Sequence, residues 1–384
     1  MTQEVKANNS TLVNSVCAIV FILFTFVYLY FFQSDIIAME QHVLSGGITH
    51  YNKTIGAVLL TVVLFLVKLG VSKLTRFDGW INILNYLPSL MFLAVLTSGN
   101  QDFDVSLFPT NVIVIVCIIV IILYAIFAVL SRQKSIFYID TSYTGSLTGG
   151  LWKSLLALSA MLLIVCALGN TNEIFHYRLR IEHLLESNDY DDALRVGEKS
   201  DDTDPDLTML RIYALSRTKQ LGERLFEYPI PKGGSDILLP DGVNVKCMMF
   251  PETEIFKQLG IRKMGKMKPL EYLLYLENHG LAMKSVTDYI LCGYLLDKNL
   301  DGFVNIIKNK YNLSSPALPK HYREALTLYT HLRSNPVLVF HSEIMDADYA
   351  DFQKLEEKYN NKSERFSYVK DTYGETYWFY YFYQ

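Results

Sequence analysis

The stretch Leu151–Gly169, LWKSLLALSAMLLIVCALG, is the last strongly apolar run in this chain of 384 residues. A helix of this length would extend about 28 Å, close to the ~30 Å hydrocarbon core of a bilayer. Before the run the sequence is rich in Ile, Val and Phe, and after it polar and charged residues prevail. We therefore expect a membrane region before it and a water-soluble region after it.

The composition supports this division. Hydrophobic residues make up 51% of the chain and charged residues only 19%. A soluble domain typically has about 25% charged residues, so part of this chain is expected to lie in lipid. The net charge of −4 requires no strongly basic face, and we expect no nucleic-acid partner.

The predicted transmembrane domain comprises residues 11–169 and follows a polar tail at residues 1–10. Its spans are predicted at residues 11–32, 55–72, 80–98, 111–130 and 151–169. The first run is too long for a cleaved signal peptide and has little positive charge before it. The third span is the weakest, because Asn82, Asn85 and Pro88 interrupt it. Lys68 lies near the end of the second span, from which its side chain could reach the interface.

Positive charges in the short loops predict the topology. Lys and Arg gather between spans two and three and between spans four and five, at Lys73, Arg76, Arg132, Lys134 and Lys153. The first loop has Lys53 alone, and the loop between spans three and four has no Lys or Arg. Because positive loops stay in the cytoplasm, we predict a cytoplasmic N-terminus and an exoplasmic region at residues 170–384.

The region after residue 169 has helical periodicity with polar turns between the helices. Helices are predicted at residues 173–187, 190–199, 207–219, 221–226, 253–259, 269–278, 282–296, 300–310, 320–333, 346–359 and 362–373, with an ordered loop at 228–253. Asp204 is a predicted N-cap, with Pro205 at the first helical position. Tyr190 and Leu221 are 31 residues apart, near the ~34-residue period of tetratricopeptide repeats. We predict an all-α fold, with five transmembrane helices followed by a tetratricopeptide-like (TPR-like) solenoid of helical hairpins.

Two carboxylates in the first outer loop are the candidate catalytic residues. Multi-span membrane glycosyltransferases have a catalytic carboxylate in this loop, where Asp35 or Glu40 could act as a base or hold a metal. Those enzymes need many more spans than five to hold a lipid-linked donor. An enzyme is therefore the alternative prediction.

Other motifs give weaker indications of a metal site. Asp297–Gly302, DKNLDG, imitates the start of an EF-hand loop, but Lys308 stands where that loop needs a bidentate carboxylate. The acidic run at Asp201, Asp202, Asp204 and Asp206 could bind a cation or form a solvated turn. Cys247 and Cys292 are the cysteines outside the spans and could form a bridge. We expect no metal and no cofactor.

The chain ends in seven aromatic residues followed by Gln384. These rings could pack as the last helix of the soluble region. Alternatively, they could present an aromatic surface to a partner or to the membrane interface. In that case the candidate binding residues are Tyr377, Trp378, Tyr380 and Tyr381.

Several segments resemble an uncharacterised family of multi-span membrane proteins from Bacteroidetes with a tetratricopeptide-like C-terminal half. The similar segments are SGG at Ser45–Gly47, YDDAL at Tyr190–Leu194, QLGERLFEYP at Gln220–Pro229, TEIFKQLG at Thr253–Gly260, LPKHYREAL at Leu318–Leu326 and YGETYWFYYF at Tyr373–Phe382. The resemblance implies a bacterial inner-membrane protein with periplasmic helical repeats. It implies no catalytic residues.

The predicted function is a membrane-anchored scaffold that presents a helical-repeat surface for protein or peptide binding in the cell envelope. Its expected partners are the lipid bilayer and an envelope protein. The alternative is a reduced glycosyltransferase-like enzyme or accessory subunit that uses the first outer loop. A transporter component is the third prediction, disfavoured because few ionisable groups lie within the spans.

Overall fold

The computed structural model describes residues 2–77, 79–99, 110–132, 147–261 and 267–384. All regular structure within these ranges is helical, and they contain no strand. The chain forms two compact units, Met1–His176 and Tyr177–Gln384, which are described separately below. The predicted all-helical class is confirmed for the described residues. Two predicted loop segments, with Asp102, Asp104 and Lys134, lie outside these ranges.

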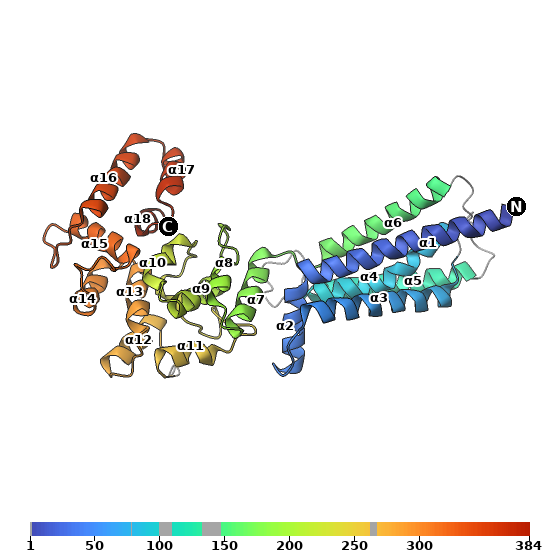
Figure 1. Cartoon of the computed structure of the whole chain (residues 1–384), viewed down its shortest axis with the longest axis horizontal. Helices are drawn as coiled ribbons and strands as arrows, with labels where there is room; N and C mark the ends of the chain where they lie inside the picture. The colour runs from blue at the N-terminus through green and yellow to red at the C-terminus, as the bar shows by residue number, and fades with distance from the viewer. Residues whose placement is uncertain (1, 78, 100–109, 133–146, 262–266) are drawn as a thin grey trace. The chain divides into compact units, whose positions relative to one another are not determined.

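The first unit consists of long apolar helices (Figure 1). Its elements are α1 (Thr2–Val27), the π-helix η1 (Tyr28–Phe32), α2 (Ser34–Ser45), α3 (Lys53–Thr75), the 3₁₀-helix η2 (Gly79–Tyr86), α4 (Leu87–Thr97), α5 (Thr110–Arg132) and α6 (Leu147–Leu168). Five segments are long and apolar enough to cross a membrane: Thr11–Phe32, Lys53–Thr75, Gly79–Thr97, Val112–Ser131 and Gly150–Leu168. The five predicted apolar spans are confirmed as helical segments. The predicted N-terminal tail is helical as well, because α1 begins at Thr2.

Large apolar side chains cover the outside of this bundle. Leu59, Leu123 and Leu163 are each more than half exposed. The interior holds smaller or closely packed groups such as Cys17 and Ala57. An apolar exterior is compatible with a membrane protein, because lipid tails solvate such side chains as well as a protein core does.

The third apolar segment begins with the 3₁₀-helix η2, and its asparagines form hydrogen bonds to other helices. Asn85 Oδ1 accepts hydrogen bonds from Thr75 Oγ1 at 2.7 Å and from Tyr124 Oη at 3.0 Å. Asn85 Nδ2 donates to Asn82 Oδ1 at 2.6 Å, and Asn82 Nδ2 donates to Asn14 Oδ1 at 2.9 Å. The residues that lower the apolarity of this segment therefore join it to α1, α3 and α5.

Lys68 does not reach the surface of the bundle, contrary to the prediction from its place in the sequence. Its side chain is only 7% exposed, and its ammonium lies 4.8 Å from the centre of the Tyr86 ring. The Phe65 ring is 5.9 Å away. Cation–π contacts therefore replace the expected solvation at the interface.

The second unit consists of shorter helices. They are α7 (Glu173–Glu186), which begins in the first unit, α8 (Tyr190–Arg195), α9 (Pro205–Arg217), α10 (Leu221–Arg224), η3 (Leu225–Glu227), η4 (Gly234–Leu238), α11 (Glu252–Leu259), α12 (Pro269–Asn278), α13 (Val286–Leu296), α14 (Leu300–Lys310), α15 (Lys320–Leu332), α16 (Glu343–Lys358), α17 (Lys362–Tyr373) and α18 (Tyr377–Tyr383). The predicted N-cap is confirmed, because Asp204 Oδ1 accepts the backbone N–H of Leu207 at 2.6 Å.

Two predicted helices are shorter in the structure, for local reasons. α8 ends at Arg195, because Gly197 adopts a φ of +60° and the Tyr177 ring lies where its Cβ would be. α13 begins only at Val286, because Gly280 has a φ of +66° and the chain then turns before re-entering a helix.

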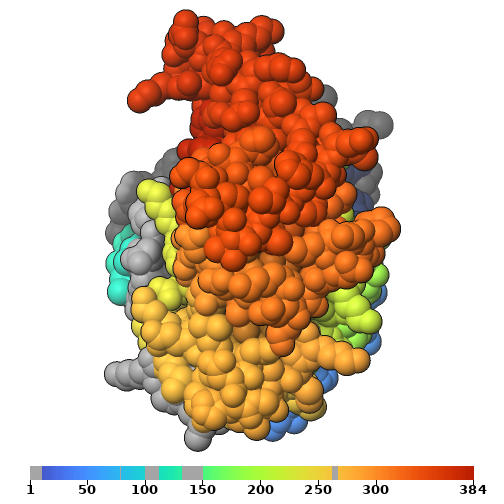
Figure 2. Space-filling view, turned by 90° about the vertical axis from the view of Figure 1, so that its left-hand side faces the viewer, coloured from blue at the N-terminus to red at the C-terminus, as the bar shows by residue number. Residues whose placement is uncertain are grey.

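Consecutive helices from α12 to α17 pack on one another, and this face is seen in Figure 2. Other contacts join helices that are distant in sequence, since α10 packs on α13 and α15 and α18 returns to α15. A regular solenoid has contacts only between neighbouring repeats. The described unit therefore has a shared core in addition to stacked hairpins.

Candidate functional site

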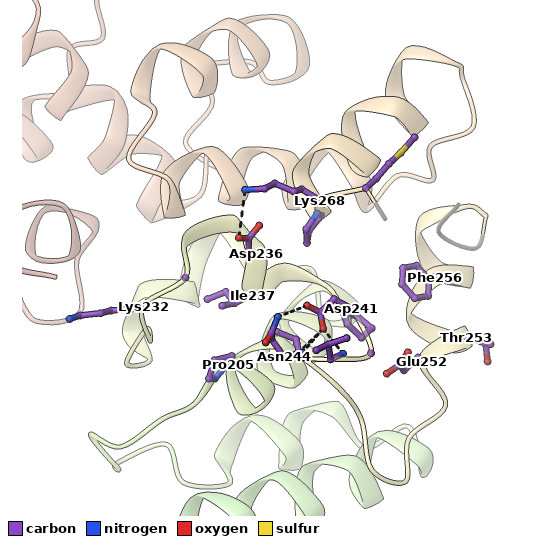
Figure 3. A pocket seen from close by; sticks show the side chains of 17 residues that line it. Pro205, Lys232, Asp236, Ile237, Asp241, Asn244, Glu252, Thr253, Phe256 and Lys268 are labelled. Atoms are coloured by element: carbon purple, nitrogen blue, oxygen red, sulfur yellow. Dashed lines mark hydrogen bonds and ion pairs between the residues drawn. The ribbon is translucent and has the colours of Figure 1, made fainter. Parts of the chain in front are cut away.

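A cleft with a volume of about 660 Å³ lies in the second unit (Figure 3). Its walls come from the loop at residues 228–251, from α11 and from the start of α12. The side chains of Ile237, Val245 and Phe256 are buried and form its apolar lining. This volume and an apolar lining are typical of ligand sites in proteins.

One edge of the cleft is a turn built on Asp241. Its Oδ1 accepts the backbone N–H groups of Val243, Asn244 and Val245 at 2.8, 2.7 and 2.9 Å. Burial tends to raise the pKa of this carboxyl, but the backbone N–H donors outweigh burial and lower the pKa. The turn leaves Val243 77% exposed at its tip. Asp241 therefore holds the turn, and Val243 presents an apolar side chain at the rim.

The rim carries charges of both signs. Asp236 and Lys268 form a loose pair, with 3.9 Å between Oδ2 and Nζ. Lys232 and Glu252 have no ion-pair partner among the residues that the structure describes. Figure 3 shows these two side chains at opposite edges of the cleft, and the Lys232 ammonium points away from the other labelled residues. An extended ligand could therefore meet a cation at one end and a carboxylate at the other.

Buried carboxylates hold the loop that returns from the cleft. Glu182 of α7 is fully buried and accepts the backbone N–H groups of Met248 at 2.9 Å and Phe250 at 2.7 Å, as well as that of Met249. Burial raises the pKa of the Glu182 carboxyl, against the opposing effect of these donors and of Arg178. The carboxylate therefore holds the loop in position through these hydrogen bonds.

A second buried group, on α9, completes this support. Asp206 Oδ1 accepts the backbone N–H of Lys246 at 2.8 Å, and its other oxygen pairs with Arg178. Arg178 is 2% exposed and also lies 3.4 Å from Asp204 Oδ2. The acidic run therefore forms the predicted turn with its capping Asp204 and leaves Asp201 exposed, and it adds Asp206 to a buried ion pair with Arg178.

Comparison with known proteins places the chain in a family. The profile of a family of unknown function matches residues 92–283 and 271–384. The chain belongs to that family, DUF6057. No curated protein and no solved structure matches it significantly. The matched segments include the whole cleft, and the expectation of an uncharacterised family is confirmed.

In this DUF6057 chain, one buried His–Glu pair resembles catalytic machinery. His321 Nδ1 lies 2.8 Å from Glu324 Oε2, and His321 Nε2 accepts the backbone N–H of Phe226 at 3.2 Å. Because Nε2 is an acceptor, the ring hydrogen is on Nδ1 and points to Glu324. Glu324 Oε2 also accepts the backbone N–H of Tyr377 at 2.7 Å. The pair therefore joins η3, α15 and α18.

The C-terminal aromatic residues pack inward. Tyr377, Trp378 and Tyr380 are 0%, 1% and 7% exposed. Trp378 Nε1 donates to the Glu324 carbonyl at 2.8 Å, and Tyr380 Oη donates to the Leu296 carbonyl at 2.7 Å. These three residues cannot form the exposed binding surface considered from the sequence, since α18 buries them against α15. Tyr381 alone of the four remains partly exposed.

Asp35 and Glu40 both lie on α2, but the structure does not bring them into one cavity. Five residues along a helix place them about 140° apart around its axis. Asp35 Oδ2 is 4.0 Å from His176 Nδ1. Glu40 instead lines a small pocket with mainly apolar walls. The paired-carboxylate hypothesis therefore lacks a shared site among the described residues.

The remaining sequence candidates have structural roles. Asp297 Oδ1 accepts the backbone N–H of Ser235 at 2.7 Å, and Asn299 Oδ1 caps α14 through Gly302 N. Cys247 and Cys292 are free thiols. Within the described ranges, no group of three or more His, Cys, Asp or Glu side chains could hold a metal ion.

The ordered loop at 228–253 was predicted from the sequence, but its place in the wall of a cleft was not. The available signal was Asp241-Gly242 within a loop rich in Pro and Gly, a pattern that predicts a fixed turn. The sequence could not predict that Lys232 and Glu252 border the same cleft, because α11 and the loop meet only in the folded chain.

Proposed function

We propose that this protein is a membrane-anchored scaffold whose second unit binds an extended peptide segment of a partner protein. The observation that carries the proposal is the cleft, with its apolar lining and its opposed rim charges. An apolar side chain of the peptide would lie against Ile237 and Phe256. Acidic and basic side chains would meet Lys232 and Glu252.

Binding is favoured over catalysis by how the buried titratable groups are used. Both oxygens of Glu182 and one oxygen of Glu324 accept backbone N–H groups, and His321 has both ring nitrogens engaged. A general base needs an open approach to the proton that it removes. A scaffold needs only a rigid, complementary surface, which these same contacts supply.

The anchor and its orientation belong to this proposal. Five apolar helical segments support insertion in a bilayer, and loop charges such as Lys73 and Arg76 support a cytoplasmic N-terminus. The second unit would then lie on the periplasmic side of a bacterial inner membrane, where the partner would be an envelope protein. Consecutive packing from α12 to α17 supports tetratricopeptide-like hairpins as the framework of the binding surface.

Selection from a random peptide library would test the proposal on the full chain in lipid nanodiscs. We expect recovered peptides to share an apolar residue flanked by one acidic and one basic residue. Lys232→Glu should weaken their binding about tenfold, because it places like charges together. Lys257→Glu on the outer face of α11 is the matched control and should leave binding unchanged.

The same selection can contradict the proposal. Recovered peptides without a common charge pattern would do so. Equal weakening by Lys232→Glu and Lys257→Glu would also do so, because Lys257 does not line the cleft.

A further inference from the structure

A second pocket, of about 370 Å³, lies in the first unit where α2 packs on α3 and α4 (Figure 1). Ile37 of α2, Leu60 of α3 and Leu96 of α4 form apolar walls. Gln41 and Thr49 stand at its polar side, with Gln41 Nε2 donating to Thr49 Oγ1 at 2.9 Å. The pocket therefore has an apolar part and a polar part.

Glu40 is the one acidic group among the described residues that line this pocket. Its half-buried carboxylate makes no hydrogen bond or ion pair within the part of the chain that the structure describes. Burial raises the pKa of this carboxyl, and no neighbouring cation offsets that effect. A carboxylate in such surroundings is stabilised by a ligand that brings a positive charge.

The position of the pocket suits a ligand that comes from the membrane. Leu60 lies seven residues after the start of α3 and Leu96 one residue before the end of α4. The pocket is therefore at one end of the apolar segments. Leu44, at its rim, is 84% exposed, and the nearby Ile48 is 83% exposed. Leu44 on the short helix α2 and Ile48 just after it are exposed apolar residues of the kind found at the boundary between hydrocarbon and water.

We propose that this pocket binds a membrane lipid with a primary ammonium headgroup. The ammonium pairs with Glu40, and an acyl chain lies against Ile37, Leu60 and Leu96. Charge complementarity selects this occupant, because its ammonium can pair with Glu40, whereas an anionic lipid without a cationic group brings only negative charge to the carboxylate. The inference rests on the proposed membrane anchor and is independent of peptide binding.

Native mass spectrometry of the full-length protein would test the inference. The protein, purified in detergent, is mixed with equal amounts of phosphatidylethanolamine and phosphatidylglycerol. We expect one phosphatidylethanolamine to be retained in preference to phosphatidylglycerol. Glu40→Gln should lower that preference about tenfold, because the charge-assisted contact is lost.

Two variants make the result specific to the pocket. Asp35→Asn removes the other carboxylate of α2, which does not line the pocket, and should keep the preference. Leu60→Trp should fill the pocket and reduce retention of both lipids. Thermal unfolding of each variant in the same detergent identifies loss of folding as a separate effect.

The lipid proposal is contradicted by equal retention of the two lipids. It is also contradicted if folded Glu40→Gln keeps the preference, or if Asp35→Asn removes it to the same extent. Failure of the membrane anchor would appear differently, as protein that stays in solution without detergent.

Discussion

The two units bury their polar groups in opposite ways. The first unit joins its helices through neutral side chains, with Asn85 hydrogen-bonded to Thr75 and Tyr124. The second unit buries full charges, notably Arg178 and Glu182. The outer surfaces differ in polarity too, because large aliphatic side chains cover the first unit and are fewer on the second. We expect this contrast in a chain whose first unit folds in lipid and whose second unit folds in water.

The physical reason is the solvation that each polar group has in the unfolded state. In lipid, a neutral amide gains by finding any partner, and such a bond contributes about 0.6–2 kcal/mol. In water, a charge is already well solvated, so its burial requires several fixed partners. Glu182 has these partners in three consecutive backbone N–H groups. Lys68 is the exception in the first unit, and two aromatic rings take the place of a counter-ion.

The largest effect is expected from Glu182→Ala. The substitution leaves the N–H groups of Met248, Met249 and Phe250 buried without their acceptor. We expect a loss of about 3–5 kcal/mol in the free energy of unfolding of the second unit. Denaturant unfolding in detergent would measure it, with Glu186→Ala on the same helix as a control. A loss below about 1 kcal/mol would contradict the central role given to buried charge.

A smaller loss, about 2 kcal/mol, is expected from Glu324→Gln. A Gln amide oxygen in place of Oε2 can still accept from His321 Nδ1–H and from the backbone N–H of Tyr377, but a neutral acceptor forms weaker hydrogen bonds than a carboxylate. The weakened contact should release α18, which limited proteolysis at the C-terminus would detect. Unchanged protease resistance would show that ring packing alone holds this helix.

In the first unit, Asn85→Ala should cost about 1–2 kcal/mol, less than the loss of Glu182. Thr75 and Tyr124 lose an acceptor, but neither carries a charge. Thermal unfolding in detergent would measure the difference from the unaltered protein. A cost equal to that of Glu182→Ala would remove the contrast between the two units.

The smallest effect is expected at the exposed turn of the cleft. The lowered pKa of Asp241 means that its ionised form stabilises the folded turn. That contribution is present above the ordinary pKa of 3.8 and is lost as the pH falls through the lower folded value. Hydrogen exchange should show protection of Val243, Asn244 and Val245 at neutral pH that decreases in strong acid. Asp241→Ala should remove the protection at every pH.

Apolar length and helical period predicted most of the helices. The bounds of α12, α14 and α17 agree with those expected, because Pro269, Asn299 and Asn361 mark their starts. The end of α8 before Gly197 and the start of α13 at Val286 were missed, because each depends on the conformation of the neighbouring turn. The burial of Lys68 was also missed, since the ring of Tyr86 comes from another helix.

The site was less predictable than the fold. Hydrogen bonds from the backbone N–H of Phe250 to Glu182 and from that of Phe226 to His321 join residues 68 and 95 positions apart. No local pattern marks such pairs, and residue type alone suggests catalysis for the second. Aromatic richness at the C-terminus likewise could not decide between exposure and packing until α15 was seen to cover the rings.

Photo-crosslinking of the full-length protein in its membrane tests the central claim most directly. A photoreactive residue is placed at Leu123 of the bundle, at Val243 of the cleft rim or at Val337, which are 60%, 77% and 75% exposed. We predict lipid adducts from Leu123, one discrete protein adduct from Val243 and neither from Val337. The same protein adduct from Val337, or no lipid adduct from Leu123, would contradict a membrane-anchored unit that binds its partner through the cleft.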